Sequence, residues 1–332
     1  MREIAYLAFT EKGRALARRL QAALGGELSC TRDGVSLRDW TAERFLNTRA
    51  LVYVGAAGIA FRAVALHLVS KTSDPAVIAV DECGSFAIPL ASGHLGGANE
   101  LAREIAGVIG ATPVITTATD ANGVFAVDEW ARIQGCAVVD PRKIKTVSGK
   151  LLAGGRVTVR SAFPIALEPP EGVELTESLP ADVWVDVRPH DGLVLAPRML
   201  TLGVGCRRGT TREALEERFD EFCRVRGILP EALRGAATID LKKDEEGLLA
   251  FCAARGWPLQ FFSSEALAAV SGEFSASDFV AAATGVDNVC ERAALLAAGA
   301  GGELFVRKYA GEGITFALAQ TPVPLDWRWR NG

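Results

Sequence analysis

The first third of the chain alternates short apolar runs with stretches whose apolar residues recur at helical spacing. The runs "EIAYLAF", "ALVYVG", "AVIAVD" and "SFAIPL" predict strands. The stretches "EKGRALARRLQAAL", "GIAFRAVALHLV" and "GGANELAREIAGVIG" place apolar side chains on one face of a helix. Strands that alternate with helices of this length are typical of a mainly parallel sheet covered by helices. We therefore predict an N-terminal α/β domain over residues 1–135.

The pattern changes in the middle of the chain and then returns. Residues 136–196 are poor in helical periodicity and rich in Pro, Gly and short β-like runs such as "RVTVR", which predicts a small β-rich linking domain. Residues 197–321 alternate strands and helices again and close with a hairpin in "ELFVRKYAGEGITFALAQ". We predict a second α/β domain there. We expect the tail over residues 322–332 to dock loosely, with packing of its two tryptophans on the body as the alternative. The predicted fold class is thus α/β, with two mainly parallel α/β domains joined by the linking domain.

Composition narrows the possible partners. The chain has 332 residues, 49% of them hydrophobic, and a net charge of −4 without runs of Lys or Arg. This balance predicts neither a nucleic-acid nor a membrane partner. We see no signal peptide and no apolar stretch near the roughly 18 residues that a membrane span needs, so we expect a cytoplasmic protein. Seven cysteines without a C-x-x-C pair indicate reduced thiols, and three histidines far apart in sequence predict no metal site.

Two glycine-rich loops of the first domain are candidates for ligand binding, because ligands of open α/β sheets bind at the carboxyl ends of the strands. In "YVGAAGIAFRA", Gly55 and Gly58 either bring backbone N–H groups to an anion or serve close packing alone. In "PLASGHLGGANELA", glycines keep bulk away from a helix entrance and leave His94 where a ligand would arrive. The other candidate contacts of this turn are Ser92, Gly93, Gly96, Gly97 and Asn99.

Three further segments carry polar groups at predicted strand or helix ends. In "TTATDANG", Thr119, Asp120 and Asn122 are candidates for ligand contact, although an Asx-type turn is equally compatible with them. The segment "LGVGCRRGTTREALEE" departs from the dinucleotide fingerprint G-x-G-x-x-G and instead places two guanidinium groups at a helix entrance. Paired arginines suit carboxylates or phosphates, and the alternative is a surface ion pair. The candidates in these last segments are Gly205, Arg207, Arg208 and Gly209, with Asn288 in "ATGVDNVCERAALL".

These segments resemble the cobalt-precorrin-5A hydrolases of anaerobic cobalamin synthesis. The resemblance lies in "GAAGIAFRAVA", "PLASGHLGGANELA", "TTATDANGVFAVDEWA", "LGVGCRRGT" and "TGVDNVCERAALLAAG". It implies a substrate that is a cobalt corrinoid precursor with several carboxylates and a δ-lactone. It implies that water opens the lactone and that a two-carbon unit leaves as acetaldehyde. The cobalt arrives with the substrate, so we expect no cofactor, and we expect transient contacts with neighbouring pathway enzymes.

Attack of water on a lactone calls for a base and for stabilisation of an oxyanion. Our candidate base is His94, because an unperturbed imidazole titrates near ~6.5, and Asp120 is the second candidate or the partner that orients the ring. Backbone N–H groups near Gly96 and Gly97 are candidate oxyanion donors. We expect the loops of the two α/β domains to face each other across a shared cleft. The alternatives are a non-catalytic tetrapyrrole carrier and, less well matched by the glycine pattern, a nucleotide-dependent oxidoreductase.

Overall fold

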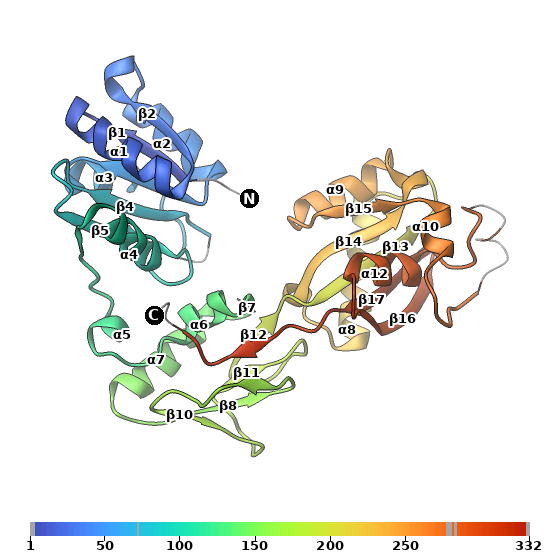
Figure 1. Ribbon diagram of the computed structural model, residues 1–332. Helices are drawn as coiled ribbons and strands as arrows, with labels where there is room; N and C mark the ends of the chain where they lie inside the picture. The colour runs from blue at the N-terminus through green and yellow to red at the C-terminus, as the bar shows by residue number, and fades with distance from the viewer. Residues whose placement is uncertain (1–3, 72, 277–280, 282–283, 330–332) are drawn as a thin grey trace.

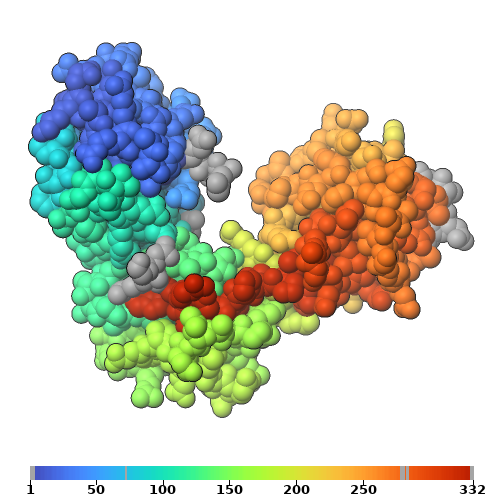
Figure 2. Space-filling view, viewed as in Figure 1, coloured from blue at the N-terminus to red at the C-terminus, as the bar shows by residue number. Residues whose placement is uncertain are grey.

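The computed structural model describes residues 4–71, 73–276, 281 and 284–329. In this part of the chain, three α/β units follow one another, each built on its own sheet (Figure 1). Figure 2 shows the first and last units on opposite sides of the middle one, with a wide hollow between them. No helix among the described residues has the length and apolar character needed to cross a membrane.

The N-terminal domain is a six-stranded sheet with the order β2-β1-β3-β4-β5-β6. All neighbours are parallel except β4 and β5, which form an antiparallel pair. The helix α1 begins after Thr10, whose hydroxyl accepts a hydrogen bond from the backbone of Gly13, and it buries Leu16 and Leu20 against the sheet. The elements are β1 (Ile4–Ala8), α1 (Glu11–Leu24), β2 (Glu27–Cys30), α2 (Leu37–Asn47), β3 (Ala50–Val54), α3 (Ala57–Val64), β4 (Ala76–Val80), β5 (Phe86–Ala91), α4 (Ala98–Ile109) and β6 (Thr112–Pro113).

The linking domain is a five-stranded sheet with the order β10-β8-β11-β12-β7, parallel except for β7. Its core includes Phe125 and Trp130, which precede the predicted domain boundary at residue 135. That boundary is therefore predicted too late, because the aromatic rings of this segment are buried here rather than on the N-terminal sheet. The elements are α5 (Ala118–Ala121), α6 (Val127–Ile133), β7 (Cys136–Val138), α7 (Ile144–Leu152), β8 (Val157–Ser161), β9 (Ile165–Ala166), β10 (Val173–Leu175), β11 (Val183–Val185) and β12 (Leu193–Pro197).

The C-terminal domain is a five-stranded sheet with the order β15-β14-β13-β17-β16, in which the first three strands are parallel and the hairpin is antiparallel. Its α12 lies so close to β13 that a Cβ atom on Gly203 would be 1.7 Å from the carbonyl oxygen of Cys290. The elements are β13 (Leu200–Cys206), α8 (Arg212–Arg226), β14 (Leu233–Ile239), α9 (Glu246–Ala254), β15 (Leu259–Phe262), α10 (Ser264–Ala268), α12 (Cys290–Ala298), β16 (Glu303–Gly311) and β17 (Ile314–Gln320). The predicted fold class, α/β with mainly parallel sheets, is confirmed.

The end of the chain returns to the linking domain, as the red segment beneath the hollow in Figure 1 shows. There β18 (Leu325–Asp326) pairs with β9, and the ring of Trp327 stacks on that of Trp130 with centroids 4.8 Å apart. The indole nitrogen of Trp130 donates a hydrogen bond of 2.7 Å to the carbonyl of Asp326. The tail is thus docked rather than loose, as the alternative of tryptophan packing predicts. Trp327 belongs to the core of the linking domain, and Trp329 packs against that core.

Replacing Trp327 with alanine should destabilise the linking domain. The side chain is buried, and removal of a buried tryptophan lowers the free energy of unfolding by about 3–5 kcal/mol. Denaturant unfolding of Trp327→Ala measures this loss. The matched control is Leu66→Ala, since Leu66 is exposed and should change stability by no more than about 0.5 kcal/mol. A docked tail is contradicted if both variants unfold at the same denaturant concentration.

Candidate active site

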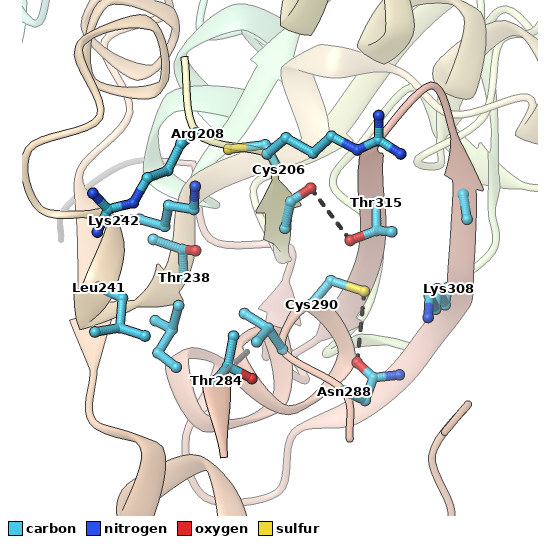
Figure 3. A pocket seen from close by; sticks show the side chains of 16 residues that line it. Cys206, Arg208, Thr238, Leu241, Lys242, Thr284, Asn288, Cys290, Lys308 and Thr315 are labelled. Carbon is cyan, nitrogen blue, oxygen red and sulfur yellow. Dashed lines mark hydrogen bonds between the residues drawn. The ribbon is translucent and has the colours of Figure 1, made fainter. Parts of the chain in front are cut away.

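A cavity of about 480 Å³ opens in the C-terminal domain. It lies where β13 and β14 end, between the start of α12 and the β16–β17 hairpin (Figure 3). The lining residues are Gly205, Cys206, Arg207, Arg208, Thr238, Ile239, Leu241, Lys242, Thr284, Asn288, Val289, Cys290, Lys308, Ala310, Gly313 and Thr315. The carboxyl ends of parallel strands are the usual place for ligands in open α/β sheets.

The cavity is cationic. Four of its lining residues are Arg207, Arg208, Lys242 and Lys308, and none is an aspartate or glutamate. The ammonium of Lys242 is 3.0 Å from the carboxylate of Glu245, outside the lining. Within the described part of the chain, the two guanidinium groups lie within 4 Å of no carboxylate, so they remain available to anions in solution.

The loops place these cations through backbone contacts. The backbone of Arg207 donates to the carbonyl of Gly313 at 3.1 Å, which ties the arginine loop to the hairpin turn. Gly313 has a φ of +79°, and a Cβ atom on it would lie 2.7 Å from the Arg207 side chain. Thr211 caps α8 through its side chain, and the hydroxyl of the preceding Thr210 donates to the carbonyl of Arg207.

The rest of the lining is apolar or uncharged. Ile239, Leu241 and Val289 form an apolar surface beside the cations, and Leu241 is largely exposed. Burial raises the pKa of the Cys290 thiol to about 11 and also raises that of Cys206. Both side chains are therefore neutral thiols at neutral pH rather than nucleophilic thiolates. The cavity suits a ligand that combines an apolar body with several anionic groups.

A buried carboxylate supports one wall of the cavity. Glu291 is fully buried and accepts hydrogen bonds from the backbone and hydroxyl of Ser275, the amide of Asn288 and the backbone of Lys308, at 2.7–3.0 Å. Asn288, a predicted ligand contact, also donates to the carbonyl of Ser275 and accepts from the backbone of Glu291. Its amide therefore holds the wall together, even though the residue lines the cavity.

The His94 side chain lies elsewhere, at the junction of the N-terminal and linking domains. Its Nε2 is 2.8 Å from Asp120 and its Nδ1 is 3.1 Å from Asp128, and only 10% of the side chain is exposed. Burial alone would lower the pKa of His94, but the hydrogen bonds with Asp120 and Asp128 outweigh it and raise the pKa to about 10. The prediction of an accessible ring that titrates near its ordinary value is wrong. The two carboxylates favour the protonated form of the ring, which is not a free base.

Asp120 is the centre of a dense hydrogen-bond network. Besides His94, it accepts from the amide of Asn99 at 3.1 Å, the hydroxyl of Thr117 and the guanidinium of Arg103. Burial would raise the pKa of Asp120, but the hydrogen bonds from His94 and Thr117 hold it below its ordinary value. A carboxylate with so many donors is a weak base.

The glycine-rich turn around His94 is closely packed rather than open. A Cβ atom on Gly96 would lie 2.3 Å from the Cβ of Ser92, and one on Gly93 would lie 2.9 Å from the amide oxygen of Asn99. Gly97, with a φ of +81°, precedes α4. These glycines therefore let the turn fold tightly around its polar network. Oxyanion donation by the N–H groups of Gly96 and Gly97 stays a prediction.

The remaining predicted contacts, Gly55, Gly58, Thr119 and Asn122, lie away from the cavity. The backbone of Gly55 donates to the carbonyl of Val80 at 2.8 Å, while a Cβ atom on Gly58 would meet open space. Thr119 is buried, and the amide of Asn122 bonds to the carbonyl of Ala118. None of these residues lines the cavity, whose walls come from the C-terminal domain alone.

Four predicted residues do meet at the cavity, and several of its other residues were not predicted. Gly205, Arg207, Arg208 and Asn288 line it, and Gly209 follows the two arginines with a φ of +73°. Lys242 and Lys308 come from loops and strands distant in sequence. A single lysine beside a strand carries no signal of its own, so only the fold reveals that these two complete the cationic lining.

Fold and site together define an α/β protein with a cationic and partly apolar cavity at the carboxyl ends of its C-terminal strands. Family models described as the N-terminal and the C-terminal parts of cobalamin synthesis protein G match residues 39–120 and 200–319. The cobalt-precorrin-5A hydrolase of Salmonella typhimurium is 34% identical over 346 residues, covering 95% of this chain and 97% of that protein. The chain belongs to the cobalt-precorrin-5A hydrolase family, a family of enzymes.

Two further proteins are similar over nearly the same length. The cobalt-precorrin-5A hydrolase of Priestia megaterium is 28% identical over 345 residues, covering 96% of this chain and 88% of that protein. A solved structure of a cobalamin biosynthesis protein G homolog from Sulfolobus solfataricus is 20% identical, with a TM-score of 0.41. It covers 96% of this chain and 97% of that one.

Replacing Glu291 with alanine should destabilise the C-terminal domain. The change removes the acceptor of four hydrogen bonds from Ser275, Asn288 and Lys308, and a buried polar group left unsatisfied costs about 1–3 kcal/mol. We expect a loss of at least about 3 kcal/mol in the free energy of unfolding, measured with denaturant. Glu303→Ala, on the exposed part of β16, is the control and should be near neutral. Wild-type stability of Glu291→Ala would show that the network does not support the wall.

Proposed function

We propose that this protein hydrolyses the δ-lactone of cobalt-precorrin-5A and releases acetaldehyde. Membership of the family supports the substrate, and one observation on this chain carries the proposal. That observation is a cavity with four cationic side chains and no carboxylate in its lining. The carboxylates of a corrinoid precursor would balance the positive charge of these side chains.

The cavity accounts for recognition of part of the substrate. Arg207 and Arg208 bind substrate carboxylates through paired N–H groups, and Lys308 adds a point charge from the opposite wall. Ile239, Leu241 and Val289 contact an apolar face of the macrocycle. At about 480 Å³, the cavity is in the lower part of the range of about 300–1,000 Å³ for drug-sized ligands. The macrocycle is larger than this cavity and therefore extends beyond it.

The proposed reaction has two steps that balance without a redox cofactor. Water adds to the lactone carbonyl and the acyl C–O bond breaks, which leaves a carboxylate on the acetate side chain and an alcohol on the two-carbon unit. The alcohol then loses its proton while the carbon–carbon bond to the macrocycle breaks. The electron pair stays on the macrocycle, which takes up a proton, and acetaldehyde leaves. The cobalt is part of the substrate throughout.

The cationic side chains of the cavity stabilise the negative charge that develops in the first step. Arginine and lysine at fixed positions lower the energy of an oxyanion, and removal of one such group typically costs about 10²–10³ in rate. The lining holds neither a carboxylate nor an imidazole, so its contribution is electrostatic. His94 lies outside the lining, and its two carboxylate partners raise its pKa, so its direct action as a base is not part of the proposal.

Anaerobic incubation with cobalt-precorrin-5A tests the function. We expect stoichiometric acetaldehyde, detected with alcohol dehydrogenase and NADH. We also expect a corrinoid product lighter than the substrate by the mass of acetaldehyde minus that of water. Binding of the corrinoid without acetaldehyde would contradict the proposal and indicate a carrier. Absence of both binding and turnover in a folded preparation would contradict both functions.

Arg207→Ala and Arg208→Ala should each weaken substrate binding. Loss of a charged hydrogen bond costs about 1.5–3 kcal/mol, which is roughly 10–150-fold in Kd. Lysine should restore only part of the affinity, because it cannot form a bidentate contact. Equilibrium titration with the substrate measures the change, and Arg19→Ala on the exposed side of α1 is the control. Equal affinity of the wild type and both alanine variants would exclude this contact.

A further inference from the structure

The polar cluster at the junction of the first two domains contains groups that ligate metals. His94 comes from the turn between β5 and α4, whereas Asp120 lies in α5 and Glu129 in α6. One nitrogen or oxygen atom from each of the three side chains lies within 4.8 Å of the others. All three side chains are at least nine-tenths buried, with 10%, 6% and 3% exposed. His94 and Asp120 are 26 positions apart, so a search for ligand spacing along the sequence does not find the group.

The two carboxylates divide their oxygen atoms between an arginine and the interior of the cluster. Arg103 bonds to Oδ1 of Asp120 and lies 3.5 Å from Oε1 of Glu129. Oδ2 of Asp120 accepts from His94, Asn99 and Thr117. Oε2 of Glu129 is buried and has no hydrogen-bond partner among the described residues. A buried carboxylate oxygen without a donor is unfavourable, and a bound cation removes that penalty.

A third carboxylate orients the imidazole for coordination. Asp128 accepts from Nδ1 of His94 at 3.1 Å, which directs Nε2 toward Asp120. Histidines that ligate metals commonly donate their other N–H group to a carboxylate in this way. The contact fixes the ring and increases the basicity of the ligating nitrogen. His190 bonds to Asp186 at 2.6 Å, and among the described residues this pair is not part of a group of three possible metal ligands.

The charges of the cluster also favour a divalent cation. Asp120, Asp128 and Glu129 carry three negative charges, and Arg103 supplies one positive charge. The nearby Arg132 is paired with Glu100 at 2.7 Å. The two negative charges that remain match the charge of a divalent cation. Buried charges that are fully balanced are the more stable arrangement.

We propose that His94, Asp120 and Glu129 bind a divalent first-row cation, with Zn²⁺ as the best match. Zinc coordinates histidine nitrogen and carboxylate oxygen at about 2.0–2.2 Å, so the ligand atoms need to close around the ion by a small shift of side chains. The imidazole favours Zn²⁺ over Mg²⁺ or Ca²⁺, which prefer oxygen ligands alone. Three protein ligands leave a fourth position for water. The ion ties the turn before α4 to α5 and α6, and it is separate from the cobalt that the substrate carries.

The test titrates Zn²⁺ into the chelator-treated full chain by calorimetry. The chain carries Cys83→Ser, because Cys83 is an exposed thiol that would bind zinc on its own. We expect one ion per chain, with Glu129→Gln weakening binding at least about tenfold and Asp128→Asn about 10–100-fold. His190→Gln removes a histidine of the other His–Asp pair and should leave the affinity unchanged. Circular dichroism of each metal-free variant confirms that it is folded.

Cobalt(II) supplies a readout that does not depend on a variant. Bound Co²⁺ with nitrogen and oxygen ligands in a four-coordinate site gives strong visible ligand-field bands, which should appear in the full chain and vanish in His94→Gln. The proposal is overturned if the folded chain binds neither Zn²⁺ nor Co²⁺ stoichiometrically. It is also overturned if Glu129→Gln binds as tightly as the wild type, or if only His190→Gln loses binding. None of these measurements uses the corrinoid substrate, so they are independent of the proposed reaction.

Discussion

Four positive charges share one cavity whose lining contains no negative charge, and the functional account depends on this imbalance. Like charges at short range repel, so the arrangement persists only because solvent or an anionic ligand compensates it. Backbone contacts and the buried carboxylate of Glu291 hold the segments that carry these cations in place despite this repulsion. Glu291 accepts four hydrogen bonds and thereby fixes the backbone of Lys308 and the amide of Asn288.

The packing of the C-terminal domain sets the shape of this cavity. Gly203 lets α12 approach β13 closely. This approach places Asn288 and Cys290 in the lining of the cavity. Gly313 leaves space for the Arg207 side chain beside the hairpin. Each glycine is required by a particular neighbour. The position of the arginine loop therefore depends on close packing by residues, such as Gly313, that are far from the arginines in sequence.

Local pattern predicted the strands, most helices and the arginine loop, because these features follow from residues adjacent in sequence. The local pattern could not predict contacts between segments that are far apart in sequence. The domain membership of Phe125, the docking of Trp327 on Trp130 and the pairing of β18 with β9 all arise from such contacts. The same limit explains the error at His94, where a glycine-rich turn suggested exposure. The fold instead buries the ring between Asp120 and Asp128.

The most direct test of the central claim compares cobyrinic acid, a cobalt corrinoid with free carboxylates, with its fully esterified form. The two ligands share the macrocycle and metal and differ in negative charge. If the cationic cavity recognises carboxylates, the acid should bind at least about tenfold more tightly, since each charged contact contributes about 1.5–3 kcal/mol. Equal affinities in equilibrium titrations would contradict anion recognition as the basis of substrate binding.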